Sequence, residues 1–308
     1  MSLPNESMQY PQRRHGMDHE RYEWSNLPDR PKVSWPGGAR IALWVTPILQ
    51  WFPLDMTATP FLAPGGLTMP YPDYRHYTNR DYGNRVGIFR LLELMDRFKL
   101  TGSVMINATI AQRYPSLLSE LTKRQLEIVA HGVDMGHLHH SGLSREDETD
   151  LVKRALDILQ SRTGAPVQGW LSPARAQSWN TLDILAEQGI EYCCDWANDD
   201  MPYETRAGGK KVLSMPLAHE SDDRMILQEF RHTEDQWLQQ TKDRFDVLYG
   251  EAERYGGRVM SLPLHAWIMG VPYRTTYVRE ALEYMLAREG VWVATGAQIA
   301  AEFRRQSQ

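Results

Sequence analysis

Short apolar runs alternate with helix-like segments along almost the whole chain of 308 residues. The runs that predict strands lie at 39–49, 101–108, 127–132, 167–173, 191–196, 211–217, 258–265 and 291–295. Most of them are apolar at nearly every position, as expected for strands that are covered on both faces. Repeated strand–helix units predict a parallel sheet, and their number favours a closed or nearly closed barrel.

The intervening segments have the apolar periodicity of helices. These helices are predicted at 85–100, 144–164, 180–189, 233–257 and 275–290. In the second of them, Ser144 is placed to cap the amino end, and Gly164 lies just beyond the carboxyl end. We expect one barrel domain over 35–308, with residues 1–34 as an extension packed on it. Residues 53–84 are rich in Pro, Gly and Tyr, fit neither pattern and predict a lid or a binding loop.

Charge and composition argue against several classes of protein. Lys and Arg number 34 against 39 Asp and Glu, which gives a net charge of −5 and argues against a nucleic-acid partner. No run approaches the roughly 18 apolar residues of a membrane span, and the polar N-terminal region lacks the apolar core of a secretory leader. Two adjacent cysteines, Cys193 and Cys194, have poor geometry for a disulfide. We expect a cytoplasmic protein that acts on a small molecule.

In parallel α/β folds, reactive side chains gather where strands end, so polar residues after a strand are candidates for function. The predicted strand at 127–132 runs into an acidic, histidine-rich segment that contains His131, Asp134, His137, His139 and His140. This pattern predicts metal binding or proton transfer, because neutral imidazole is both a common metal ligand and a base near neutral pH. The alternative is a solvated loop in which some of these histidines only form hydrogen bonds.

Two further strand ends carry charged side chains. Arg175 follows the strand at 167–173 and could orient a carboxylate or a carbonyl, although a surface ion pair is the simpler alternative. Three carboxylates, Asp195, Asp199 and Asp200, lie at the end of the strand at 191–196. They could bind a metal, hold a histidine or raise one another's pKa, or they could only cap turns.

The strand at 258–265 ends in His265, and Trp267 follows two residues later. A lone histidine after an apolar strand is often a core residue. Beside the other strand ends, His265 is better interpreted as a general acid or base. Trp267 is then either part of a pocket wall or part of the core.

Several motifs occur together in this order: WPGGARIALWV, the HG of residues 131–132, GWLSPAR, YCCDWANDDMPY, LPLHAWIMGVPYR and VWVATGAQIA. Together they resemble the polysaccharide deacetylase superfamily (NodB-like, carbohydrate esterase family 4) over about residues 35–301. Within it they are most similar to the cytoplasmic branch of cofactor-independent allantoinases and cyclic imide hydrolases. The resemblance implies a single-domain α/β protein with a distorted (β/α)7-type barrel, and an enzyme that hydrolyses C–N bonds other than peptide bonds.

The sequence departs from the metal site of this superfamily. Its deacetylases use an Asp pair after the first strand and a His-x-x-x-His motif, but here Gln50 follows the first strand and Met135 lies four residues after His131. Two alternatives follow from the resemblance. The enzyme works without a metal, or it builds a different site for one divalent metal such as zinc from His131, Asp134 and His137.

We therefore expect a hydrolase that opens a small cyclic amide, imide or ureide, or removes an N-acyl group. Water activated by His131, or by a metal held there, would attack the carbonyl. Arg175 or backbone N–H groups would stabilise the oxyanion. His265, oriented by Asp199 or Asp200, would protonate the leaving nitrogen.

The remaining candidates are expected to shape the pocket and contact the substrate: Gln50, Asp195, Tyr203 and Trp267. One alternative is a metal-dependent N-deacetylase of a sugar or a peptidoglycan fragment. Another is a non-catalytic, ligand-binding protein of the same fold. Because barrels of this branch often associate, we also expect a homo-oligomer.

Overall fold

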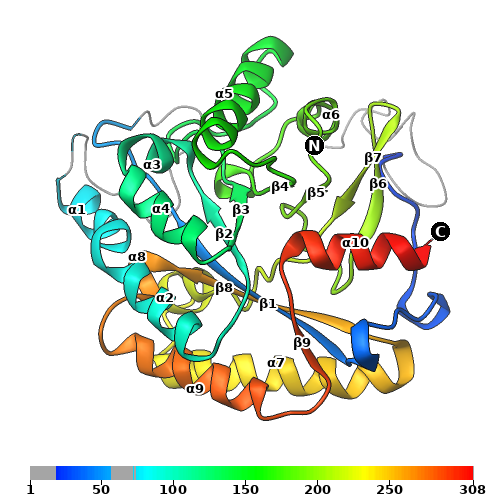
Figure 1. Ribbon diagram of the computed structural model, residues 1–308. Helices are drawn as coiled ribbons and strands as arrows, with labels where there is room; N and C mark the ends of the chain where they lie inside the picture. Colours follow the sequence, from blue (N-terminus) through cyan, green and yellow to red (C-terminus); the bar gives the residue numbers. More distant parts are fainter. Residues whose placement is uncertain (1–18, 57–71, 73, 308) are drawn as a thin grey trace, which may run out of the picture.

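The computed structural model describes residues 19–56, 72 and 74–307 (Figure 1). These residues form one sheet of nine strands in the order β6-β7-β5-β4-β3-β2-β1-β8, with β9 paired to β1. The strands are β1 Ile41–Leu49, β2 Ser103–Ile106, β3 Glu127–Ala130, β4 Gly169–Trp170, β5 Tyr192–Cys193, β6 Tyr203–Ala207, β7 Lys210–Ser214, β8 Arg258–His265 and β9 Val291–Val293. All pairings are parallel except that between β6 and β7.

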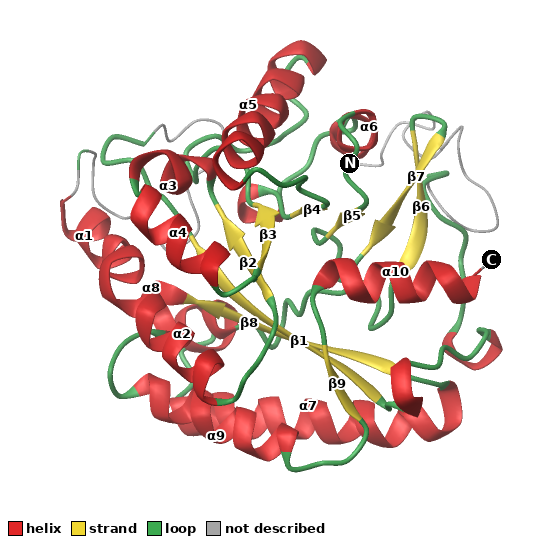
Figure 2. Ribbon diagram, in the orientation of Figure 1, coloured by secondary structure: helices red, strands yellow, loops and turns green. Residues whose placement is uncertain are grey.

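The sheet is curled, and helices surround it (Figure 2). The helices are α1 Tyr74–Tyr82, α2 Ile88–Arg97, α3 Ala108–Arg113, α4 Pro115–Lys123, α5 Arg145–Thr163, α6 Thr181–Glu187, α7 Glu234–Tyr255, α8 Ala266–Met269, α9 Arg274–Leu286 and α10 Gly296–Ser307. Every residue of β1 and β8 is buried, as expected for strands covered on both faces. The predicted barrel of strand–helix units is confirmed as a half-barrel, because no described residues pair β7 with β8.

Helix α5 has the ends that the sequence predicts. The side chain of Ser144 accepts a hydrogen bond from the backbone N–H of Asp147, and Gly164 closes the helix in the left-handed conformation at φ 69°. Both features satisfy backbone groups that a helix end leaves without partners.

The region between β1 and α2 differs in part from the predicted long loop. Residues 57–71 and 73 of the segment 53–84 lie outside the described residues, whereas Tyr74–Tyr82 form helix α1. A π-helical turn, Gly83–Gly87, then joins α1 to α2. A side chain at Gly83 or Gly87 would collide with the backbone of Trp267 or Ala266. These glycines therefore let the turn pack closely against the end of β8.

The described part of the N-terminal extension, residues 19–34, contacts the barrel near β6. The carbonyl of Arg21 accepts a hydrogen bond of 2.7 Å from the N–H of Arg206. Residues 1–18 lie outside the described residues. No helix within the described ranges is long and apolar enough to cross a membrane.

Candidate active site

A small cavity of about 40 Å³ lies where β1, β3, β4 and β8 end. Four residues that the sequence singled out line it: Gln50, His131, Arg175 and His265. Four polar residues that it did not single out line the same cavity: Ser172, His219, Asp222 and Arg224. The apolar lining comprises Ile48, Phe52, Met135, Leu171 and Leu217. The carboxyl ends of neighbouring parallel strands thus bring distant side chains together.

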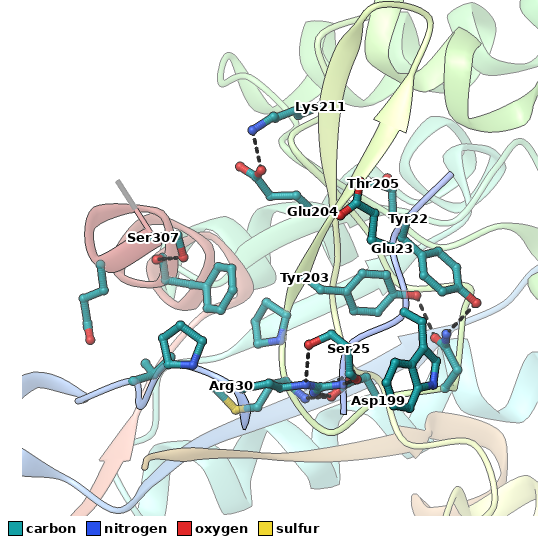
Figure 3. Close-up of a pocket in the computed structure, with 18 of the residues that line it drawn as sticks. Tyr22, Glu23, Ser25, Arg30, Asp199, Tyr203, Glu204, Thr205, Lys211 and Ser307 are labelled. Carbon is teal, nitrogen blue, oxygen red and sulfur yellow. Dashed lines mark hydrogen bonds and ion pairs between the residues drawn. The ribbon is translucent and has the colours of Figure 1, made fainter. Parts of the chain in front are cut away.

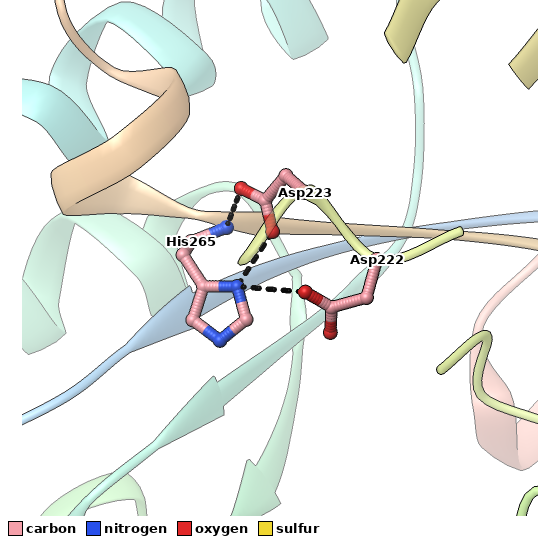
Figure 4. Close-up of side chains that lie close together, drawn as sticks. All are labelled: Asp222, Asp223 and His265. Atoms are coloured by element: carbon pink, nitrogen blue, oxygen red, sulfur yellow. Dashed lines mark hydrogen bonds and ion pairs between the residues drawn. The ribbon is translucent and has the colours of Figure 1, made fainter. Parts of the chain in front are cut away.

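His265 and Asp223 form a buried pair at the end of β8 (Figure 4). Nδ1 of His265 lies 2.6 Å from Oδ1 of Asp223, and the backbone N–H of His265 donates to Oδ2 at 2.8 Å. Asp222 lies farther away, with its Oδ1 3.5 Å from the same ring nitrogen. A carboxylate oxygen only accepts, so Nδ1 carries the proton and Nε2 is left for chemistry.

Burial alone would lower the pKa of His265, but the carboxylates of Asp223 and Asp222 raise it above the ordinary value of 6.5. Burial raises the pKa of Asp223, although His265 opposes this effect. The two carboxylates thus favour the protonated form of His265, so its ring can accept a proton and hold it for transfer, as general acid–base catalysis requires.

His131, at the end of β3, takes part in a hydrogen-bonded relay. Its Nδ1 lies 2.8 Å from the carbonyl oxygen of Leu171, which only accepts, so Nδ1 carries the proton. Nε2 then accepts from the amide nitrogen of Gln50 at 3.2 Å, and Oε1 of Gln50 accepts from Nε1 of Trp267 at 3.1 Å. Every donor in the relay meets an acceptor. Burial lowers the pKa of His131 to about 4, so its ring is neutral.

Comparison with known proteins identifies the domain. A family model described as polysaccharide deacetylase matches residues 73–193. A Schizosaccharomyces pombe protein named "Putative polysaccharide deacetylase" is 26% identical over 263 residues, which cover 78% of this chain and 81% of that protein. Residues 73–193 thus match a polysaccharide deacetylase domain.

Similar solved structures cover nearly the whole chain. Puue allantoinase is 25% identical with a TM-score of 0.81, and the match covers 92% of this chain and 98% of that one. A structure from Pseudomonas aeruginosa, described as a probable polysaccharide deacetylase, is 26% identical with a TM-score of 0.80 and covers the same shares. The resemblance inferred from the motifs is thereby confirmed at the level of the domain and its fold.

The metal of polysaccharide deacetylases does not fit the residues present here. A metal ligand needs a free lone pair, but both ring nitrogens of His131 are engaged in the relay. Oδ1 of Asp134 accepts from the N–H of Gly136 at 2.8 Å and lies 2.7 Å from Nδ1 of His137, so these two predicted ligands bind each other. The predicted set of His131, Asp134 and His137 is therefore not assembled as a metal site.

Among the residues that the structure describes, one group has donor atoms close enough to share a metal: Asp222, Asp223 and His265. Nδ1 of His265 and both oxygens of Asp223 are, however, bonded to each other and to backbone. Oδ1 of Asp222 accepts from the backbone N–H of Arg224 at 2.7 Å, which leaves Nε2 of His265 and the second oxygen of Asp222. Two donors fall short of the three protein ligands of a metal site.

Arg175 lines the cavity, and its side chain binds the backbone of the surrounding loops. Its guanidinium donates to the carbonyls of Cys194 at 3.0 Å, Leu217 at 3.1 Å and Ala218 at 2.7 Å. Its backbone is left-handed, with φ 56°. Three of its five N–H donors are thus committed to the protein. The expected role of Arg175 in stabilising an oxyanion stays a prediction that depends on its two other N–H donors.

The predicted carboxylates after β5 do not reach His265. Asp195 accepts from the N–H of Ser172 at 2.7 Å and from the side-chain amide of Gln177 at 2.5 Å, so it supports the loop after β4. Asp199 pairs with Arg30 at 2.6 Å, and Asp200 is exposed. The orienting role expected of Asp199 or Asp200 therefore belongs to Asp223, which follows β7 rather than β5.

A larger cavity, of about 820 Å³, lies between the N-terminal extension, β6 and α10 (Figure 3). Asp199 and Tyr203 line this larger cavity and do not line the one that contains His131 and His265. The hydroxyl of Tyr203 donates to Asn198 at 2.7 Å. Tyr203, expected to bind substrate, thus lies apart from the acid–base pair.

The sequence interpretation overlooked the end of one strand. His219, Asp222, Asp223 and Arg224 follow the predicted strand at 211–217 within seven residues. The rule applied to the other strand ends would have found them, and the adjacent Asp222 and Asp223 were the clearest signal.

Proposed function

We propose that the chain opens a small cyclic amide, imide or ureide by adding water to a ring carbonyl without a metal. The deacetylase domain makes the chain a hydrolase of C–N bonds other than peptide bonds. The observation that carries the finer proposal is the buried His265–Asp223 pair facing a small cavity. The extensive likeness to Puue allantoinase also supports it.

In the first step, Nε2 of His265 takes a proton from water while the water oxygen attacks the carbonyl carbon. Asp223 holds the ring through Nδ1, so Nε2 stays directed for this transfer. The carboxylate also favours the imidazolium that forms, as in other histidine–carboxylate pairs. The result is a tetrahedral intermediate with negative charge on the former carbonyl oxygen.

In the second step, the intermediate collapses and the C–N bond breaks. The proton held on Nε2 of His265 passes to the leaving nitrogen, which prevents its departure as an anion. The ring opens to an acid and an amide or urea, and His265 returns to its neutral form. One residue thus acts first as base and then as acid.

We reassign His131 from the base expected from the sequence to a positioning role. Its Nε2 lone pair accepts from Gln50, and its low pKa makes it a weak base. The relay through Gln50 to Trp267 instead holds the wall of the cavity in one arrangement.

One experiment distinguishes this proposal from the alternative, an N-deacetylase of sugar or peptidoglycan fragments. Purified chain would be incubated with succinimide, dihydrouracil, hydantoin, allantoin and N-acetylglucosamine. We expect at least one ring to open, and His265→Asn, which keeps an N–H toward Asp223 but lacks Nε2, to slow that reaction about 10³-fold. The matched control is His232→Asn, because the side chain of His232 is exposed, bonds to Gln240 and does not line the cavity. Acetate release from the sugar with every ring intact would overturn the proposal.

A further inference from the structure

His219 lies in the segment that follows β7. It lines the small cavity that also contains His131 and His265. Its Nδ1 is shielded from solvent and has no hydrogen-bond partner within the described part of the chain. A polar ring that faces a reactive cavity with one nitrogen unpaired calls for a physical explanation.

The missing partner indicates where the ring carries its proton. Burial lowers the pKa of His219, and Arg175 lowers it further, so the ring is neutral and has one N–H. A buried N–H without a partner is rarer than an acceptor without one. The proton therefore belongs on Nε2, and Nδ1 is the bare acceptor. His219 then offers a neutral N–H donor to whatever occupies the cavity.

The backbone on both sides of His219 is fixed. Arg175 donates to the carbonyls of the two preceding residues, Leu217 and Ala218. The N–H of Ala218 donates to Oγ of Ser261 in β8 at 2.9 Å, and the N–H of Asp222 donates to the carbonyl of His219 at 3.1 Å. A donor held in this way costs little reorganisation during a reaction.

We propose that the Nε2–H of His219 binds the carbonyl oxygen under attack and stabilises its negative charge when water adds. This inference rests on the proposed function and assigns an oxyanion donor other than Arg175, three of whose five N–H groups already bind carbonyls. His219 also adjoins Asp222 and Asp223, so donor and acid–base pair come from one short segment. The substrate class that follows is an uncharged ring with a planar carbonyl.

The test compares two variants that differ in the donor. In His219→Gln, the side-chain amide keeps an N–H near the position of Nε2, whereas His219→Leu has no donor. With the ring that the wild-type chain opens fastest, we expect His219→Leu to lower kcat about 10²-fold and His219→Gln about tenfold or less. KM should change much less than kcat, because the bond strengthens in the transition state. His232→Leu is the control and should leave kcat unchanged.

A second measurement determines directly which nitrogen of the His219 ring carries the proton. Nitrogen-15 NMR of the full-length chain should show Nδ1 of His219 as an unprotonated, pyridine-like nitrogen. A protonated Nδ1, or a folded His219→Leu variant with wild-type kcat, would overturn the inference. A wild-type chain that opens no ring would instead refute the proposed function, so the two failures are distinguishable.

Discussion

Nδ1 of His265 lies 2.6 Å from Oδ1 of Asp223, although the two residues are 42 positions apart in the chain. The second oxygen of the same carboxylate accepts from the backbone N–H of His265. One carboxylate thus fixes the ring and the backbone of the histidine together. This arrangement makes Asp223 the residue on which proton transfer in the cavity depends.

Replacing Asp223 with Asn removes the charge and retains the shape. We expect Asp223→Asn to lower kcat/KM by about 10²-fold or more, because the imidazolium loses its counter-charge and the ring loses its preferred tautomer. Steady-state kinetics on an opened ring would measure this loss. The control is Asp199→Asn, which breaks only the ion pair with Arg30. Equal losses in both variants would contradict the assignment.

The pH dependence should follow His265. If its neutral form accepts the proton from water, kcat/KM rises with pH as His265 loses its proton, with a midpoint above 6.5, because the neighbouring carboxylates raise its pKa. In Asp223→Asn the midpoint should move to lower pH, since the main source of the raised pKa is gone. A midpoint that stays in place in the variant would mean that another group titrates.

Turnover should not depend on a metal. Among the described residues, the predicted ligands His131, Asp134 and His137 do not bring their donor atoms close enough together to share a metal. We expect ring opening to proceed at an unchanged rate after dialysis against EDTA, and added zinc to give no increase. Loss of activity with EDTA and recovery with zinc would show that the relay rearranges to form a metal site.

Gln50→Glu should raise the pKa of His131. A carboxylate has no N–H to donate to Nε2, so the ring would gain a proton and its pKa would rise from about 4. An NMR titration of His131 in both proteins measures this shift. Gln50→Met is the matched control, because it removes the donor without adding charge. An unchanged pKa of His131 in Gln50→Glu would contradict the relay.

Arg175 should matter for stability more than for the chemical step. Arg175→Lys keeps the charge but cannot reach three carbonyls, and we expect it to lower the free energy of unfolding by about 2–4 kcal/mol. Urea denaturation measures the change. A variant of unchanged stability whose kcat falls by orders of magnitude would return Arg175 to the oxyanion role expected from the sequence.

The parts of the fold that hydrophobic periodicity determines could be predicted from the sequence. Helix α5 has the predicted cap and end because Ser144 and Gly164 act locally. Helix α1, in contrast, has a polar and aromatic sequence whose helical state depends on packing against Trp267 and its neighbours, and periodicity carries no record of such packing.

The site residues that follow β1, β3 and β8 could be predicted from the sequence. Gln50 and His265 meet because β1 and β8 are neighbours in the sheet, and His131 follows β3, which β2 separates from β1. The partner of His265 could not be chosen this way, since Asp223 comes from the loop after β7, at the far side of the sheet order from β8. Only the curl of the sheet brings that loop to β8.

The central claim is ring opening by His265. The most direct measurement is a time course of ring opening in metal-free buffer, with succinimide, dihydrouracil, hydantoin and allantoin, for the wild-type chain and His265→Asn. The account predicts that the wild-type chain opens at least one ring and that the variant does so about 10³-fold more slowly. Rings that stay closed with the wild-type chain, or open equally fast with the variant, would contradict it.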